Sequence, residues 1–450
     1  MSELLDLATR IAERASKDED VEAFLTHERN FEVKVFEGEV DALSSAEPRG
    51  AGVRVFADGK VGFAYTTDLS DAGLEQVLDR ARANCRHSTS EEANGIAQPA
   101  DIRNESIDGL VDPAFASLGA DAKVRFALEL ESATRSLDAR VRTVEEAAYA
   151  DSQTEVALAT SAGTSGSYER SDAWCYVMAI AEEGDDTEIG FDFDLARSGT
   201  GLDLQAVARS AVDRAVGVLG AGKIPSAQMP VVFDPYTAAR FLGVLATALT
   251  AEAVQKGRSL FADRIGEAVA ASGISLIDDG RVEGGPRAAP WDAEGVPTRR
   301  TELISGGVLA SFLYDTKTAR REGKTSTGNA ARAGFKSPPG VSPTNLALEP
   351  TGATREDVLR SAGKAFLVLD LHGVHSGANP VSGDFSVGAT GMLLENGAST
   401  RPVKEVTIAA PMLEILRSIR SVADDRRWIP FGGGYGGATT LIGEMTVAGT

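Results

Sequence analysis

The apolar positions at the amino terminus repeat at helical spacing and then begin to alternate. In residues 2–15 one face carries only apolar side chains, and Ser2 is available as a cap, so a helix is predicted. FEVKVFEGEV follows, in which Phe31, Val33 and Val35 alternate with charged residues, as in a half-buried strand. VRVFADGKVGFAY predicts a hairpin, because Asp58-Gly59 supplies the positive φ angles of a tight turn. A second amphipathic helix is expected over 74–85.

From about residue 120 the order of helix and strands recurs. Alternating segments predict strands around 141–143, 156–160 and 174–180, and apolar spacing predicts a closing helix near 203–217. GAGKIPSAQMP (220–230) interrupts both periodicities with glycine and proline, so it is the best linker between two domains.

The second half is rich in glycine and in short apolar segments. PVVFDP predicts a buried strand and residues 236–256 predict a helix. Further strands are expected in ISLIDDG, TELISGGVLASFLYD, FLVLDL and FSVGATGMLLENGAS, the last with an Asn396-Gly397 turn. One more helix, with Pro411 in its first turn, is expected to extend to Val422.

The expected fold class is α+β in two domains. Residues 1–222 are expected to form strand meanders backed by helices. Residues 226–450 are expected to form a β-rich, barrel-like domain with flanking helices.

Charge and composition exclude several classes of partner. The 450 residues carry a formal charge of −21, which repels nucleic-acid phosphates and anionic lipid headgroups. No apolar run approaches the roughly 20 residues that cross a bilayer, and MSELLDLATR lacks the order of a signal peptide. Only Cys85 and Cys175 are present, which excludes a disulfide framework and favours a reducing cytoplasm.

Nucleophile and metal motifs are scarce. None of the four histidines lies in an H-E-x-x-H helix, although His372 and His375 remain open as loop ligands. Cys175 lies in an alternating strand, where a thiol is usually inert, and no G-x-S-x-G signature occurs. FGGGYGG (431–437) does not end in Lys-Ser/Thr, so its glycines are expected to allow close backbone packing or an unusual loop.

Two polar clusters remain, and each has two interpretations. KTSTGNAARAGF (324–335) contains Asn329 and Arg332, and NPVSGDFSVGATG (379–391) contains Asp384 and Ser386. Such clusters form turns capped by their own side chains, or they line a groove for a peptide backbone.

Several segments together resemble the TldD/PmbA (TldE) family. The most specific are WDAEGVPTRRTELISGGVLASFLYDTKTARREG (291–323), the following TSTGNAAR, NPVSGDFSVGATGMLLENG and the closing TVAG. FEVKVFEGEVDALSSAEPRGAGVRVF in the first half is also typical, so the resemblance covers nearly the whole chain. It implies a cytosolic, zinc-dependent proteolytic system in which TldD and TldE form a heterodimer that acts on small, unfolded or modified peptides.

The resemblance also implies where metal ligands should lie. TldD-type chains carry an H-E-x-x-x-H helix and a C-terminal cysteine, and the corresponding helix here lies within residues 236–255. That segment has no histidine and offers Gly243, Val244 and Thr247 around the expected register; no cysteine follows Cys175. The chain is therefore expected to be of the TldE/PmbA type, with no catalytic residue, no metal ligand and no cofactor of its own.

Three functions follow as hypotheses. The first is a non-catalytic subunit whose TldD-type partner supplies the zinc, with the substrate-groove candidates Asn329, Arg332, Asp384 and Ser386. The second is an autonomous hydrolase with a non-standard metal site near His372 and His375, with Asp384 beside them. The third is a homodimeric peptide-binding accessory of a biosynthetic pathway.

Overall fold

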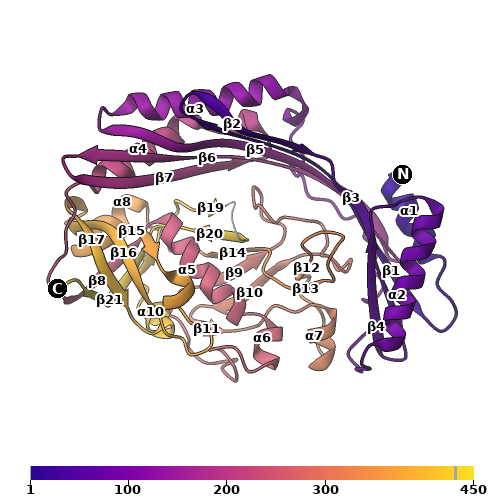
Figure 1. The fold of residues 1–450 in the computed structure, drawn as a ribbon. Helices are drawn as coiled ribbons and strands as arrows, with labels where there is room; N and C mark the ends of the chain where they lie inside the picture. Colours follow the sequence, from indigo (N-terminus) through magenta and orange to yellow (C-terminus); the bar gives the residue numbers. More distant parts are fainter. Residues whose placement is uncertain (1, 430–432) are drawn as a thin grey trace.

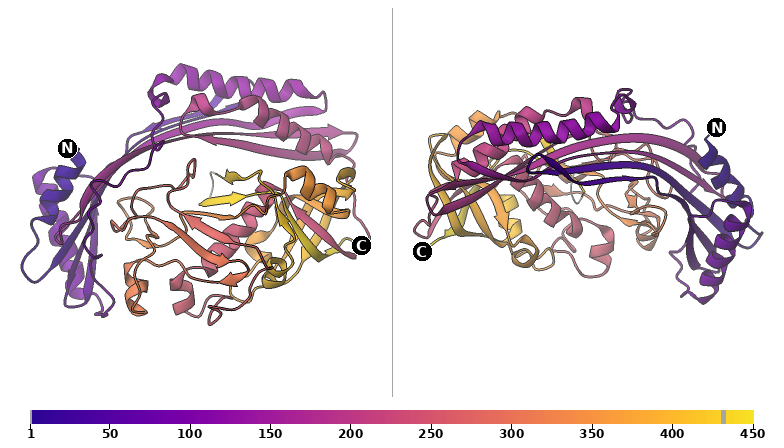
Figure 2. Two further views of the ribbon diagram at one scale, coloured as in Figure 1. Left: turned by 180° about the vertical axis from the view of Figure 1, so that it is seen from behind. Right: turned by 45° about the horizontal axis from the view of Figure 1, so that its top comes forward.

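The computed structural model describes residues 2–429 and 433–450. A long, strongly curved sheet from the first half of the chain arches over the second half (Figure 1). Its helices lie on the convex face, and the C-terminal half fills the concave side in every view (Figure 2). The two halves therefore meet along the inner face of the sheet.

The helices and strands of the first half follow the order that the hydrophobic pattern predicts. They are α1 (Glu3–Ala12), β1 (Asp20–Phe36), β2 (Glu39–Ala46), β3 (Arg49–Ala57), β4 (Lys60–Thr66), α2 (Asp71–His87), η1 (Phe115–Ser117), α3 (Ala120–Leu137), β5 (Val141–Thr160), β6 (Ser165–Glu183), β7 (Asp186–Ala196), η2 (Gly199–Gly201) and α4 (Leu204–Gly217).

One seven-stranded sheet holds this half together, in the order β4-β3-β1-β5-β6-β7 with β2 paired to β1. Strand β1 is long enough to pair with β3 through its first part and with β2 through its last part. Its Val21, Ala23 and Leu25 pack against α1 and α2 on the convex face. The alternate residue Phe24 packs with Trp291 of the C-terminal half. Both faces of this part of the sheet are therefore buried.

The predicted hairpin turn between β3 and β4 is confirmed. Asp58 and Gly59 have φ angles of 52° and 71°, and Ala57 pairs with Lys60 across them. Asn396 and Gly397 form the predicted turn of the second half with φ angles of 54° and 86°. These left-handed pairs match the twist of the strands that they join.

The second half contains more strands than helices. Its elements are β8 (Ala227–Phe233), α5 (Pro235–Ala248), α6 (Ala251–Gln255), β9 (Leu276–Asp279), β10 (Arg300–Ser305), β11 (Val308–Leu309), α7 (Thr316–Arg321), β12 (Ala330–Ala331), β13 (Gly340–Val341), β14 (Asn345–Leu348), α8 (Arg355–Ser361), β15 (Lys364–His372), α9 (Val374–Gly377), β16 (Ser386–Glu395), β17 (Ala398–Ala409), α10 (Met412–Arg417), β18 (Ser421–Val422), β19 (Arg427–Ile429), β20 (Gly434–Gly437) and β21 (Thr440–Ala448).

The predicted barrel is confirmed. Strands β17, β16, β15, β8 and β21 pair in that order, and β17 pairs with β21 to close the ring. A second sheet, β11-β10-β9-β14-β20-β19, lies beside it, with α5 in the shared hydrophobic core. The protein is thus an α+β fold with a closed barrel in its second half.

Two helix predictions were wrong in extent. The helix expected over 236–256 is interrupted, because Thr250 leaves helical geometry and its hydroxyl caps the amide of Ala253 to start α6. The helix expected to reach Val422 ends at Arg417, since Val422 pairs with Thr440 in the barrel sheet. Within the two described ranges, no helix has the length and apolar character needed to span a membrane.

Candidate functional site

Helix α5 occupies the position at which the resemblance implies metal ligands. Asp234 caps it by accepting the amide of Thr237 at 2.8 Å, and Pro235 fits the first turn. Gly243 faces β20, where the ring of Tyr435 is so close that a Cβ atom on Gly243 would lie 3.3 Å from it. The tyrosine ring therefore covers the middle of this helix.

The residues on α5 do not fit a zinc ion. Zinc in proteins is bound by imidazole, thiolate or carboxylate, and Gly243, Val244 and Thr247 provide none of these groups. Among residues 2–429 and 433–450, no group of three or more histidine, cysteine and acidic side chains could hold a metal ion, the set His372, His375 and Asp384 included. We therefore derive no chemical step from a metal bound to this chain.

The glycine-rich segment FGGGYGG packs closely, as predicted, in its described part. A Cβ atom on Gly434 would lie 2.0 Å from the carbonyl oxygen of Thr344, and one on Gly437 would lie 1.9 Å from that of Pro235. Residues 431 and 432 of the segment lie outside the described residues. Glycine at 434 and 437 thus lets β20 lie directly against β14 and the start of α5.

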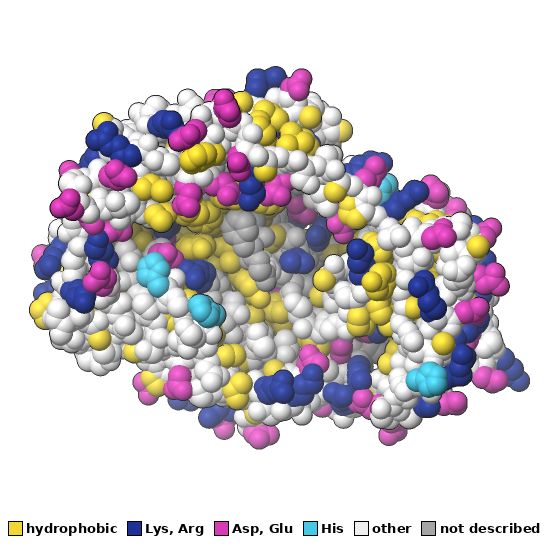
Figure 3. All heavy atoms as spheres, in the orientation of Figure 1, with side chains coloured by type: hydrophobic (Ala, Val, Ile, Leu, Met, Phe, Trp, Pro, Cys, Tyr) yellow, Lys and Arg dark blue, Asp and Glu magenta, His cyan; other side chains and the backbone are white. Residues whose placement is uncertain are grey.

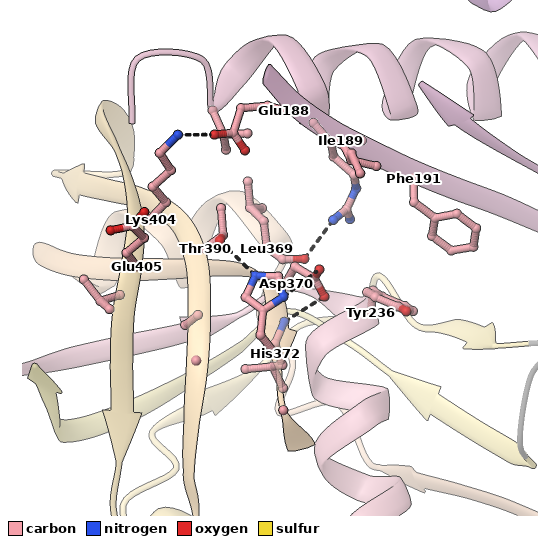
Figure 4. Close-up of a pocket in the computed structure, with 18 of the residues that line it drawn as sticks. Glu188, Ile189, Phe191, Tyr236, Leu369, Asp370, His372, Thr390, Lys404 and Glu405 are labelled. Carbon is pink, nitrogen blue, oxygen red and sulfur yellow. Dashed lines mark hydrogen bonds and ion pairs between the residues drawn. The ribbon is translucent and has the colours of Figure 1, made fainter. Parts of the chain in front are cut away.

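A hollow runs under the arch of the sheet, and hydrophobic side chains line much of it (Figure 3). At its end near the barrel is a cavity of about 1080 Å³. The cavity is bounded by β6, β7 and α4 from the first half, and by the start of α5 and strands β15–β17 from the second half (Figure 4). Both halves of the chain therefore build it.

Several polar groups that line this cavity are paired with one another. Arg240 on α5 donates to Asp370 Oδ1 at 2.8 Å and to the carbonyl of Leu371 at 2.7 Å. His372 Nε2 lies 3.0 Å from the hydroxyl of Thr390, and its Nδ1 lies 3.7 Å from Asp370 Oδ2 (Figure 4). The cavity thus holds a histidine and a carboxylate side by side.

The mouth of the cavity combines charge with an exposed apolar side chain. Lys404 on β17 binds Asp186 at 2.6 Å and also pairs with Glu188, and hydrogen bonds to both carboxylates raise the pKa of the lysine. Ile189 beside them is 56% exposed. A cavity with apolar walls and internally paired charges is suited to binding a ligand.

The predicted groove residue Asn329 is 2% exposed and lies in a buried polar network. Its amide donates to Asp278 Oδ2 at 2.6 Å, and its carbonyl oxygen accepts from Thr327 at 2.6 Å. Thr344 donates to Asp278 through its backbone amide and its hydroxyl, at 2.8 and 2.9 Å. Burial nevertheless raises the pKa of Asp278 to about 6.

The predicted groove residue Arg332 joins the two halves of the chain. Its guanidinium pairs with Glu22 of β1, and the side chains of Arg332 and Glu22 are 1% and 0% exposed. Arg54 of β3 also pairs with Glu22 and reaches Glu294 at 3.0 Å. Although burial opposes it, the charges of Arg54 and Arg332 hold the pKa of Glu22 below its usual value. Arg332 also lines a second cavity, in addition to its place in this ion cluster with Glu22, Arg54 and Glu294.

The remaining predicted residues lie at the surface of the barrel. Asp384 accepts a hydrogen bond from Ser382 at 2.6 Å, and Ser386 is the exposed first residue of β16. His372 ends β15, whereas His375 is exposed on α9 beyond Gly373, whose φ angle is 67°. A groove role for Asp384 and Ser386 remains a prediction.

Sequence analysis missed the buried ion cluster of Glu22, Arg54 and Glu294. Two of these residues carried a signal, because each places a charge within an apolar strand, in DVEAFL and GVRVF. Charged side chains are rarely buried without a partner, so such positions mark ion pairs or sites. Glu22 and Arg54 are 32 residues apart, but their further partners Arg332 and Glu294 lie 310 and 240 residues away.

The large concave sheet and the closed barrel that it covers both match domains of one known protein family. Models of PmbA/TldA metallopeptidases match residues 21–85 (domain 1), 113–219 (central domain) and 226–449 (C-terminal domain). The chain belongs to the PmbA/TldD family.

Relatives with PmbA and TldD names are both similar to this chain over most of their length. Metalloprotease PmbA of Escherichia coli O157:H7 is 25% identical, covering 98% of this chain and 95% of the relative. A metalloprotease TldD homolog of Haemophilus influenzae is 28% identical, covering 89% of this chain and 87% of the relative.

Solved structures show the same fold. A putative modulator of a DNA gyrase from Thermotoga maritima superposes with a TM-score of 0.90 at 26% identity, covering 98% of this chain and 99% of that one. TldE from Thermococcus kodakarensis also gives 0.90, at 22% identity, over 99% of this chain and 100% of that one.

Proposed function

We propose that this chain is a TldE/PmbA-like subunit of a cytosolic TldD/TldE-type metalloprotease system. A TldD-type partner supplies the zinc and the hydrolytic step, and this chain contributes contacts to the partner and to small or unfolded peptides. The chain itself holds no cofactor. It works in a heterodimer, with a homodimer as the alternative assembly, and binds neither nucleic acid nor membrane.

The observation that carries this proposal is that α5 lacks side chains that could bind a zinc ion. One face of the helix packs in the core. On its other, less buried face Gly243, Val244 and Thr247 offer no metal ligand, and the ring of Tyr435 lies against Gly243. The domain that contains this helix matches the family. A chain that retains the fold but lacks the donor groups is suited to a binding role.

The hollow under the sheet supports a role in holding peptides. It is bounded by both halves of the chain, and much of its surface is hydrophobic (Figure 3). Peptides that lie extended against such a surface gain affinity from main-chain hydrogen bonds and apolar contacts, which tolerates many sequences. The free and buried cysteines, Cys85 and Cys175, agree with a reducing cytoplasm.

Peptide hydrolysis by the separated and combined subunits tests the proposal. We expect no hydrolysis of an unfolded casein or a short fluorogenic peptide by this chain alone. Hydrolysis should appear only when a TldD-type chain from the same organism is added, and it should stop on chelation of zinc. A partner chain with its metal-binding histidines replaced is the matched control, and hydrolysis by the lone chain at the rate of the mixture would overturn the proposal.

An autonomous hydrolase is the second candidate, because His372 and Asp370 lie 3.7 Å apart inside the large cavity. That function requires activity of the lone chain that falls by orders of magnitude in His372→Ala. His375→Ala is the matched control, since His375 does not line the cavity. If the lone chain is inactive, this candidate is excluded.

A further inference from the structure

A second cavity, of about 600 Å³, lies farther along the hollow, between the concave face of the sheet and loops of the C-terminal half. Strands β1, β5 and β6 form one wall. Residues 287–298, 330–334 and 342–344 contribute the other wall. Phe24, Tyr168 and Trp291 make part of this lining apolar, and the rings of Tyr168 and Trp291 meet edge to face at 4.8 Å.

Two arginines in this cavity have incomplete partners. The guanidinium of Arg287 makes no hydrogen bond or ion pair with any described residue. Arg170 Nε lies 3.3 Å from Asp172 without hydrogen-bond geometry. Asp172 is also paired with Arg197. Three arginines thus share one carboxylate, which leaves excess positive charge in this part of the cavity.

Burial and repulsion from Arg170 lower the pKa values of Arg287 and Arg197. Burial, and then the charge of Arg170, lowers the pKa of Arg287 below its ordinary value. Burial also lowers the pKa of Arg197; the charge of Asp172 opposes this effect and the charge of Arg170 adds to it. A negatively charged ligand would relieve this repulsion, because each arginine stays protonated at neutral pH.

Two acidic side chains that line the same cavity, Asp292 and Glu28, make no ion pair with Arg170 or Arg287 within the described part of the chain. Asp292 accepts the backbone amides of Glu294, Val296 and Ala330 at 2.9 to 3.0 Å. Glu28 accepts from Asn30 at 3.3 Å. Arg332, the other arginine in the lining, is already paired with Glu22. Arg287 thus has no carboxylate partner among the described residues, and Arg170 has only its 3.3 Å contact with Asp172.

Polar atoms without partners gather in the same place. Thr26 Oγ1, Arg170 Nε and Trp291 Nε1 are buried and have no hydrogen-bond partner among the described residues, and all three residues line this cavity. Thr26 and Trp291 are 3% and 1% exposed. A buried donor without a partner costs stability, so three in one cavity point to a ligand that supplies acceptors.

We propose that this cavity binds a carboxylate of a peptide between the guanidinium groups of Arg170 and Arg287. Thr26 and Trp291 donate to carbonyl oxygens of the same peptide. This inference rests on the proposed peptide-binding function. It adds that the site selects peptides by a carboxylate group. Planar guanidinium groups match a carboxylate in geometry, and the aromatic wall accepts the chain beside it.

Peptide binding by the full chain tests this site. The probes are three forms of one N-acetylated octapeptide whose side chains are uncharged. The first has a free C-terminal carboxylate, the second has a C-terminal amide, and the third is the amide with one central residue replaced by glutamate. Inorganic phosphate is the fourth probe. We expect at least one carboxylate form to bind about tenfold or more tightly than the uncharged amide, because charge-assisted hydrogen bonds are the stronger ones. Whichever form binds tightly identifies the source of the carboxylate.

Arg287→Gln should remove this preference and leave the weak binding of the amide unchanged. Arg209→Gln is the matched control, since Arg209 is exposed on α4 outside the cavity. Arg287→Lys, which keeps the charge, should retain part of the preference. That result would show that the loss in Arg287→Gln comes from the missing charge and not from misfolding. Equal binding of all peptides, binding of phosphate alone, or no binding would each overturn the inference. Zinc-dependent hydrolysis by the mixed subunits is measured separately, so failure of this site and failure of the proposed function are distinguishable.

Discussion

Glu22 of β1 and Arg332 of the C-terminal half form an ion pair across the two halves of the chain, with side chains 0% and 1% exposed. Arg54 and Glu294 complete the cluster, so that two arginines are balanced by two glutamates. Burying four charges is tolerable only because each has a partner of opposite sign. The cluster therefore fixes the sheet relative to the loops that it covers.

Replacing one member of this cluster should destabilise the protein strongly. Glu22→Gln leaves Arg54 and Arg332 buried and removes one of the two glutamate charges that balance them. We expect the free energy of unfolding in urea to fall by about 3 to 5 kcal/mol, as when one partner of a buried pair is lost.

The matched control is an exposed pair. Oε1 of Glu252 on α6 lies 2.6 Å from Nζ of Lys256 just after the helix, and the two side chains are 45% and 49% exposed. Glu252→Gln should change the free energy of unfolding by less than about 1 kcal/mol, because exposed pairs contribute little. Equal effects of the two substitutions would show that the buried cluster does not stabilise the contact between the halves.

Asp278 should make the protein more stable in mild acid. Burial raises its pKa to about 6 in the folded chain, above the ordinary value of 3.8. Between these two values the folded chain binds more protons than the unfolded chain, so this contribution to stability is lost as the pH rises through 6. The free energy of unfolding should thus be higher at pH 5 than at pH 7.5 by about 1 kcal/mol from this group.

The Asp278→Asn variant isolates that contribution. Its urea unfolding should show a smaller rise between pH 7.5 and pH 5 than the unmodified chain. Asp213→Asn, at an exposed position on α4, should retain the full rise. An undiminished rise in Asp278→Asn would contradict the assignment.

The close approach of β20 to α5 makes Gly437 sensitive to substitution. A Cβ atom there would lie 1.9 Å from the carbonyl oxygen of Pro235 and 2.4 Å from the amide nitrogen of Ala239. Because both neighbours are backbone atoms, Gly437→Ala must displace the strand, and we expect a loss of about 1 to 3 kcal/mol in a thermal unfolding experiment. Gly217→Ala, whose added methyl meets no atom within 4 Å, should be nearly neutral.

Neither cysteine should react in the folded protein. Cys85 and Cys175 are 4% and 0% exposed, and burial raises the pKa of Cys175 to about 12. Since the thiolate is the reactive form, Ellman's reagent should label no thiol quickly in buffer and both thiols in denaturant. Ser44→Cys in the exposed strand β2 is the positive control. Rapid labelling of a native thiol in the unmodified chain would show that the packing around that cysteine is loose.

Local patterns predicted those parts of the fold that local interactions determine. The Asp58-Gly59 turn could be predicted, because its residues adopt positive φ angles irrespective of the rest of the chain. Phe31, Val33 and Val35 alternate because only one face of their strand is buried, against α3. The preceding segment 20–27 does not alternate, since both of its faces are buried, and it was not predicted as a strand.

The candidate residues illustrate what sequence patterns cannot supply. The sequence predicts Asn329 and Arg332 as groove residues, but it gives no sign of their buried partners Asp278 and Glu22, which lie 51 and 310 residues away. No periodicity connects positions so far apart. The cavity beside Arg332 is likewise built from strands and loops that meet only in the folded chain.

The central claim is that α5 of this chain seats no zinc, and metal analysis tests it most directly. The chain is purified without its partner, supplied with one equivalent of zinc, passed through a desalting column and analysed by inductively coupled plasma mass spectrometry. We predict far less than one zinc ion per chain, with the TldD-type partner treated in parallel retaining its metal. One equivalent of zinc retained by the lone chain would contradict the account.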